Sequence, residues 1–203
     1  MHLKQPQAQD QLLRLIMDIF SNEHIISKAS KELFLGDVIL RKIPHIDYFE
    51  DFVYLANKYR NLFRNNFQDN SLIPYKESLS FFLNLESDST RVLYAISMKE
   101  EWIGHFGFRI LDNNSILLDN ALRFSNNGGK DLFQKINLLF IDFIFKSDPD
   151  IKIAIILERK NTNALKLHKN INFRELSDVE HEKLGIDYKN FSLQSLSKSD
   201  HRS

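Results

Sequence analysis

The chain has 203 residues, with 27 Lys and Arg against 27 Asp and Glu and a formal net charge of zero. This length fits one globular domain, and the 43% hydrophobic and 27% charged residues exclude a disordered or fibrous protein. The lack of cysteine excludes thiol nucleophiles, disulfides and thiolate metal sites, and the balanced charge argues against a nucleic-acid binder. No apolar stretch approaches the roughly 18 to 20 residues that cross a bilayer, so we expect a cytoplasmic protein without a membrane span.

The first 36 residues are predicted to form an N-terminal helical extension. Leu12, Leu13, Leu15, Ile16, Ile19 and Phe20 have the spacing of an amphipathic helix over residues 10–20. Its apolar face would pack against the same domain, against a second copy in a homodimer, or against a membrane surface. Residues 21–36 are predicted to be a polar link with a short helix ending near Gly36.

The central part of the chain predicts two helices followed by an antiparallel meander. The expected order is a strand at 38–43, a helix around 48–56, a loop at 60–74, a helix from Pro74 to Leu85, and strands at 92–98, 102–111 and 116–124. An Asx-type turn at 112–114 joins the last two strands.

The remainder alternates between helices and strands. The expected elements are a loop at 125–130, a helix at 131–146, a buried strand at 151–157, a helix at 161–170, strands at 173–176 and 186–193, and a polar tail at 197–203. The sequence therefore predicts one α/β (α+β) domain over residues 37–196, with a mixed, mostly antiparallel sheet flanked by helices.

The loop at 125–130 carries the first functional signal. Gly128 and Gly129 allow the backbone to approach a ligand closely, and the following helix presents free N–H groups and a positive dipole end, which suit a pyrophosphate. Lys130 adds a positive charge. Asn-Asn-Gly-Gly is also ordinary turn chemistry, and the loop matches neither the Walker A pattern nor the dinucleotide fingerprint.

A second motif follows the buried strand. Asn161, Ala164, His168, Asn172 and Phe173 occupy the positions of a pattern that reads Asn, two residues, Ala, three residues, Tyr, three residues, Gly-Phe. With the loop and the element order over residues 38–193, this pattern resembles the GNAT acyltransferase superfamily. The resemblance implies a GNAT-like sheet, acetyl-CoA as cosubstrate, and transfer of an acetyl group to an amine.

A narrower resemblance concerns the acceptor. Leu118–Arg123 is similar to the Asp-Asn-x-x-Arg strand of GNAT members that act in bacterial surface polysaccharide biosynthesis. Arg60-Asn61, Ile73, the helix at 75–85 and Trp102–His105 are similar to nucleotide-amino-sugar N-acetyltransferases. The implied acceptor is a nucleotide-linked amino sugar. The alternatives are a protein N-terminus, an amino acid or a polyamine as acceptor, or a non-catalytic module that binds acyl-CoA.

The chain departs from the family pattern at three places. The two glycines of the loop are adjacent rather than separated by one residue, the helix-end glycine is Asn172, and the tyrosine is His168. Asn tolerates the left-handed conformation better than most residues do. The conformation of the loop and the identity of the proton donor are therefore the open questions.

The resemblance implies a role for each candidate residue. His168 takes the place of the tyrosine that protonates the leaving thiolate, and Asp119 is the candidate base, with Glu158 and His105 as reserves. The alternatives are a solvated His168, an Asp119 that binds backbone or the substrate ammonium, and a His105 that is an ordinary core or surface histidine.

The implied binding residues fall into two groups. For the cofactor they are the backbone of Leu122 and Arg123 on the pantetheine arm, Asn127, Gly128, Gly129 and Lys130 on the pyrophosphate, and Asn161, which also caps its helix. For the acceptor they are Arg60, Arg64, Lys76 and His105. The seven histidines show no HxxxH or HxH spacing, so no metal site is expected.

Overall fold

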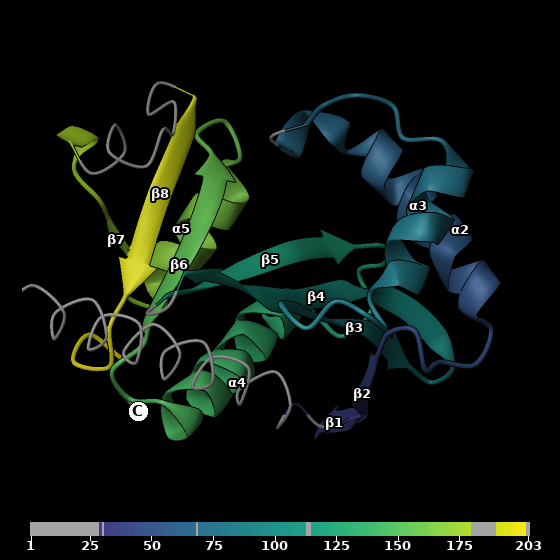
Figure 1. The fold of residues 1–203 in the computed structure, drawn as a ribbon, viewed down its shortest axis with the longest axis horizontal. Helices are drawn as coiled ribbons and strands as arrows, with labels where there is room; N and C mark the ends of the chain where they lie inside the picture. The colour runs from purple at the N-terminus through teal and green to yellow at the C-terminus, as the bar shows by residue number, and fades with distance from the viewer. Residues whose placement is uncertain (1–28, 30, 68, 113–114, 180–189, 202–203) are drawn as a thin grey trace, which may run out of the picture.

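The protein folds around one eight-stranded mixed sheet in a computed structural model that describes residues 29, 31–67, 69–112, 115–179 and 190–201. The strands are β1 (Glu32–Leu35), β2 (Val38–Lys42), β3 (Arg91–Met98), β4 (Glu101–Asp112), β5 (Ser115–Arg123), β6 (Lys152–Glu158), β7 (Arg174–Glu175) and β8 (Phe191–Leu196). Their order in the sheet is β1-β2-β3-β4-β5-β6-β8-β7, and all pairs are antiparallel except β5 with β6 (Figure 1). The predicted fold class is confirmed.

Helices cover both faces of the sheet. They are α2 (Phe49–Leu62), α3 (Tyr75–Asn84), α4 (Leu132–Ser147) and α5 (Thr162–Asn170), with a short 3-10 helix, η1 (Arg64–Asn66), after α2. Alternate side chains of β3 point to opposite faces, as the two-residue period of a strand requires. Tyr94 and Ile96 pack in the core under α4, whereas Leu93 and Ala95 pack in a second core under α2 and α3.

β5 and β6 separate along their length, and this separation creates the site. They pair only over Ser115–Leu117 and Lys152–Ala154. Beyond those residues the two strands diverge, so 118–123 of β5 and 155–158 of β6 face each other without hydrogen-bonded pairing (Figure 1). β6 remains antiparallel to β8 along its whole length. The edge of β5 that follows Leu117 is therefore open to a ligand.

Several predicted boundaries are corrected. Residues 32–35 form an edge strand of the sheet rather than part of a helical extension, and Gly36 lies in the β1–β2 turn with φ 60°. α2 continues to Leu62 into the predicted loop. The strand predicted at 186–193 is described from Phe191 and continues to Leu196, while residues 186–189 lie outside the described residues.

Other predictions fall on residues that the structure leaves out. The helix at 10–20, with its three alternatives, and most of the turn at 112–114 lie outside the described residues. The polar tail is described to residue 201, where the His201 Nε2 lies 2.8 Å from Asp142 Oδ1 on α4. The tail is therefore packed against the domain at that point rather than fully solvated.

Candidate functional site

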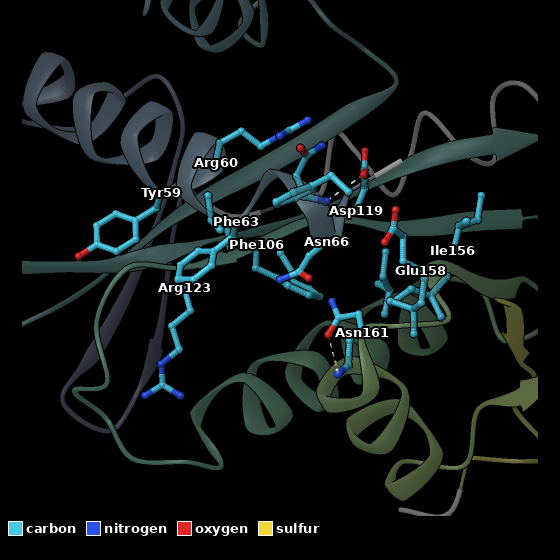
Figure 2. A pocket seen from close by; sticks show the side chains of 18 of the residues that line it. Tyr59, Arg60, Phe63, Asn66, Phe106, Asp119, Arg123, Ile156, Glu158 and Asn161 are labelled. Carbon is cyan, nitrogen blue, oxygen red and sulfur yellow. Dashed lines mark hydrogen bonds between the residues drawn. The ribbon is translucent and has the colours of Figure 1, made fainter. Parts of the chain in front are cut away.

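A cavity of about 790 Å³ lies where β5 and β6 diverge. Its walls come from the end of α2 and the segment after it, from β5, from the end of β6 and from the start of α5 (Figure 2). The lining residues include Tyr59, Arg60, Phe63, Phe67, Arg109, Asp119, Asn120, Leu122, Arg123, Glu158, Asn161 and His168. The structure thus brings together predicted residues from four separate stretches of the chain.

A bulge in β5 shapes the middle of this cavity. The register with β4 passes from Gly107–Asp119 to His105–Leu122, so β5 carries one extra residue between these pairs. Asn120 adopts a left-handed backbone conformation with φ 54°, and its N–H donates a hydrogen bond to Asp119 Oδ1 at 2.8 Å. The bulge places Asn120 and Ala121 on the cavity wall.

Asp119 is paired with two arginines and with the backbone of the bulge. Its Oδ2 lies 3.2 Å from Arg91 Nη2 on β3 and 3.6 Å from Arg109 Nε on β4, while Oδ1 accepts the Asn120 N–H. Both carboxylate oxygens therefore have partners inside the protein. This geometry favours a role in fixing the bulge, and it does not support the predicted role of Asp119 as the base.

His105 lies behind the cavity wall instead of on it. Its side chain is 5% exposed and is surrounded by the rings of Phe52, Phe82 and Phe124, whose centroids lie 5.7 to 6.1 Å away. The ring hydrogen bonds to the Asn120 backbone, but burial dominates and lowers the pKa of His105 to about 4. His105 is a neutral support of the bulge, so the predicted contact with substrate has no geometric basis.

His168 is also buried and neutral. Its Nδ1 donates to the Ala164 carbonyl at 2.8 Å, and its Nε2 lies 3.3 Å from Asn137 Oδ1 on α4. Burial lowers its pKa to about 4, so the imidazolium is scarce at neutral pH. Because both ring nitrogens face protein atoms, this geometry does not support the predicted proton transfer from His168 to a leaving thiolate. The contacts instead link α5 to α4.

The two buried histidines predict a pH-dependent stability. Between the unfolded pKa near 6.5 and the folded pKa of about 4, the unfolded chain binds more protons than the folded protein at His105 and His168. The free energy of unfolding should therefore fall as pH drops through this window, by about 1.4 kcal/mol per pH unit for each histidine. Urea unfolding between about pH 7 and about pH 5 measures this slope.

Variants isolate the contribution of one histidine. His168→Phe should reduce the pH slope by about half of the part that the two histidines contribute. His45→Asn is the matched control, because it removes a histidine that is exposed rather than buried. Equal slopes in the wild type and His168→Phe would contradict the burial argument.

Glu158 is a carboxylate that faces the cavity. It is the last residue of β6, its side chain is 10% exposed, and its ion-pair partner is the exposed Lys160, with Nζ 3.0 Å from Oε2. Figure 2 shows Glu158 with Asp119 among the side chains that line the cavity. Unlike Asp119, Glu158 is not enclosed by arginines. Its position suits a group that accepts a proton from a bound amine.

The loop at 125–130 leads from the cavity to α4. Ser125 and Asn126 line the cavity, and the exposed Gly128 and Gly129 follow with φ 84° and 81°. Among the described residues, the backbone N–H groups of Asn126, Gly128 and Lys130 have no hydrogen-bond partner. A loop with free N–H groups at a helix N-terminus is suited to an anion.

The other predicted cofactor residue, Asn161, lies at the start of α5. Its side-chain oxygen accepts the Ala164 N–H at 3.3 Å, which makes it the N-cap of α5, and the residue also lines the cavity. The capping alternative is therefore seen directly, and contact with a cofactor remains a prediction.

Aromatic rings form the end of the cavity that α2 and the following segment line. Tyr59 stacks between Phe124 and Phe63, with ring centroids 5.4 and 6.1 Å away, and Phe63 is 40% exposed. The Arg60 guanidinium lies 4.3 Å from the centre of the Phe67 ring. Arg60 therefore borders the cavity, whereas Arg64 and Lys76 are exposed and are not among its lining residues.

Sequence reasoning missed the aromatic wall and the bulge. The ring residues that stack, Tyr59 and Phe63, are four positions apart, but the predicted loop began between them. The sequence carries one signal for an irregularity where β4 pairs with its neighbours. Gly104 and Gly107 lie inside β4, and glycine inside a strand often marks a bulge or a close approach of backbones. A Cβ at Gly107 would lie 2.0 Å from the Val92 carbonyl oxygen.

The described residues contain neither a candidate metal site nor a candidate membrane-spanning helix. No group of three or more His, Asp or Glu side chains that could hold a metal ion occurs among the described residues. Within the same residues, none of the helices combines the length and the apolar content that a bilayer-spanning segment requires.

Comparisons with known proteins identify the fold. No family model and no curated protein matches the chain. The solved structure of the N-acetyltransferase PseH from Campylobacter jejuni, in complex with acetyl coenzyme A, shares 19% identity at a TM-score of 0.58, over 79% of this chain and 99% of that one. Apo FdhC, a nucleotide-linked sugar GNAT, shares 14% identity at a TM-score of 0.64, over 85% of this chain and 93% of that one.

A third solved structure is that of a protein acetyltransferase. RimL, a ribosomal L7/L12 alpha-N-protein acetyltransferase in complex with coenzyme A, shares 12% identity at a TM-score of 0.60, over 82% of this chain and 97% of that one. The chain therefore has the GNAT fold, and the resemblance found in the sequence is confirmed at the level of the fold.

Proposed function

We propose that the protein is an acetyl-CoA-dependent N-acetyltransferase. The observation that carries the proposal is the divergence of β5 and β6 into a cavity of about 790 Å³, with a loop of free backbone N–H groups at one end. The open edge of β5 around Leu122 offers backbone groups to the pantetheine arm in the manner of an added strand. The loop offers N–H groups to the diphosphate. The described residues therefore fit acetyl-CoA.

The chain's own residues support direct transfer to an amine. Acetyl-CoA supplies an acyl group on a thiol that can leave. The Glu158 carboxylate accepts a proton from the acceptor ammonium, directly or through a water, and this frees the nitrogen lone pair. The C–N bond then forms as the C–S bond breaks, and the surplus proton on the nitrogen passes to the thiolate. His168 and Asp119 take part by holding α5 and the β5 bulge in place.

For the acceptor we propose a nucleotide-linked amino sugar of surface polysaccharide synthesis. The stacked rings of Tyr59 and Phe63 end in an exposed face that suits a flat base or the apolar face of a sugar. Arg60 and Arg109 border the same cavity and suit phosphate oxygens. FdhC, with the same fold, is a nucleotide-linked sugar GNAT, which supports this choice.

A protein N-terminus is the second candidate, because RimL has the same fold. A free-thiol release assay with acetyl-CoA decides between the candidates. The panel comprises free amino sugars, their nucleotide-linked forms, peptides with free N-termini, amino acids and polyamines. We expect thiol release with nucleotide-linked amino sugars above all others. Release with peptides alone would replace the acceptor, and binding of acetyl-CoA with no transfer to any amine would favour a non-catalytic module.

A further inference from the structure

Arg123 makes three hydrogen bonds to carbonyl groups of the loop that follows it. Its Nε donates to the Ser125 carbonyl at 2.6 Å, and its Nη2 donates to the Asn127 carbonyl at 3.2 Å and to the Gly129 carbonyl at 2.9 Å. The guanidinium carbon also lies 5.9 Å from the centre of the Phe133 ring, in the first turn of α4. One side chain therefore joins the end of β5, the loop and the start of α4.

Arg123 binds the carbonyl of every second residue in the loop. This pattern determines the direction in which the N–H groups of the intervening residues point. In a trans peptide the carbonyl of one residue and the N–H of the next point in opposite directions. Because the carbonyls of Ser125, Asn127 and Gly129 turn toward the guanidinium, the N–H groups of Asn126, Gly128 and Lys130 turn away from it. These three N–H groups have no hydrogen-bond partner among the described residues.

We propose that Arg123 is a positioning residue that holds the 125–130 loop in its anion-binding form without itself touching the diphosphate. This proposal rests on the proposed function. Three carbonyl oxygens that converge on one point repel one another unless a cation lies between them, and the fork of a guanidinium supplies both the charge and several donors. Figure 2 shows the Arg123 side chain directed away from the other labelled side chains of the cavity.

The proposal predicts different effects on the binding of two parts of coenzyme A, the diphosphate and the pantetheine arm. Without Arg123 the three carbonyls lose their common donor, and the free N–H groups no longer share one direction. The loss should affect ligands that carry the diphosphate and spare a ligand that lacks it. A residue that only stabilised the fold would affect both ligands.

Arg123→Gln tests this separation. We expect coenzyme A to bind about 10- to 100-fold more weakly, measured by calorimetry, because several charge-assisted hydrogen bonds are weakened. Pantetheine, measured by ligand-observed NMR, should bind equally to the variant and the wild type. Arg123→Lys should fall between them, because an ammonium keeps the charge but lacks the planar fork. Arg41→Gln, at an exposed ion pair of β2 with Glu32, is the matched control and should change neither affinity.

The outcomes distinguish failure of the Arg123 proposal from failure of the proposed function. Equal affinity of wild type and Arg123→Gln for coenzyme A would overturn the proposal, as would an equal loss for coenzyme A and pantetheine. A crystal structure of the complex with the Arg123 guanidinium on the diphosphate would overturn it as well, by making Arg123 a direct ligand. Failure of the wild type to bind coenzyme A would instead remove the proposed function.

Discussion

Replacement of Gly128 by valine is expected to weaken coenzyme A binding by about 100-fold or more, while the protein still folds with a melting temperature lowered by roughly 2 to 8 °C. Gly128 has φ 84°, a conformation that a β-branched residue adopts only under strain. A Cβ at this position would also lie 2.5 Å from Leu132 Cδ2, and Leu132 is a buried residue of the main core. Leu132 or the loop must therefore shift, and the strain of a β-branched residue at this φ displaces the N–H groups from the positions that an anion requires. Calorimetric titration with coenzyme A measures the loss.

Gly129→Ala is the matched control for steric crowding. Gly129 has a similar φ of 81°, but a Cβ there meets nothing within 4 Å. We expect a loss of no more than about 30-fold, because only the backbone strain of roughly 1 to 2 kcal/mol remains. An unchanged affinity of Gly128→Val would remove the loop as the diphosphate site. Equal losses at the two glycines would show that the contact with Leu132 is unimportant.

The order of most elements could be predicted because it depends on local periodicity. The apolar residues of α4 fit a helical period, the continuous apolar run of β3 fits a strand buried on both faces, and the two glycines mark the loop that precedes α4. β1 could not be found in this way. It has four residues, its burial alternates between exposed and half-buried, and Phe34 is 64% exposed, so no core pattern is visible in the sequence. Its pairing with β2 is what makes it a strand.

The environments of the candidate site residues depend on tertiary structure that a single sequence does not contain. Asp119 is enclosed because the register places Arg91 of β3 opposite Arg109 of β4, and β4 pairs with β5 only when the sheet forms. His168 follows the spacing of a helix, but its burial depends on Asn137 of α4. The motif therefore located the position, while burial decided the protonation state.

The same argument moves the proposed base from one strand to another. The sequence favoured Asp119 because it lies in the middle of the strand that the family motif marks. Arg91 and Arg109 lie near enough to pair with it, whereas the ion-pair partner of Glu158 is an exposed lysine. A carboxylate that accepts protons must have an oxygen that a substrate can reach. Glu158 satisfies this condition at the end of β6.

Glu158→Gln is expected to lower kcat by about 100- to 1000-fold at neutral pH, with a much smaller change in coenzyme A affinity. Glutamine keeps the shape of the side chain and cannot accept the ammonium proton. The acceptor amine must then lose its proton to water before it attacks. The defect should therefore shrink as pH rises through the pKa of the acceptor amine, where the amine is already neutral. A purely structural role would give a defect that does not depend on pH in this way.

Glu175→Gln provides the matched control. Glu175 also ends a strand and also pairs with one cation, Arg159, at 2.6 Å, but it is half-exposed on β7 and lies outside the cavity. Its replacement should leave kcat unchanged. If Glu158→Gln keeps full turnover at neutral pH, no carboxylate at the end of β6 removes the proton, and the amine must reach the cavity already neutral. The acceptor would then be an amine of low pKa, and the selection of the neutral form would fall to the aromatic wall of Tyr59 and Phe63 rather than to a base.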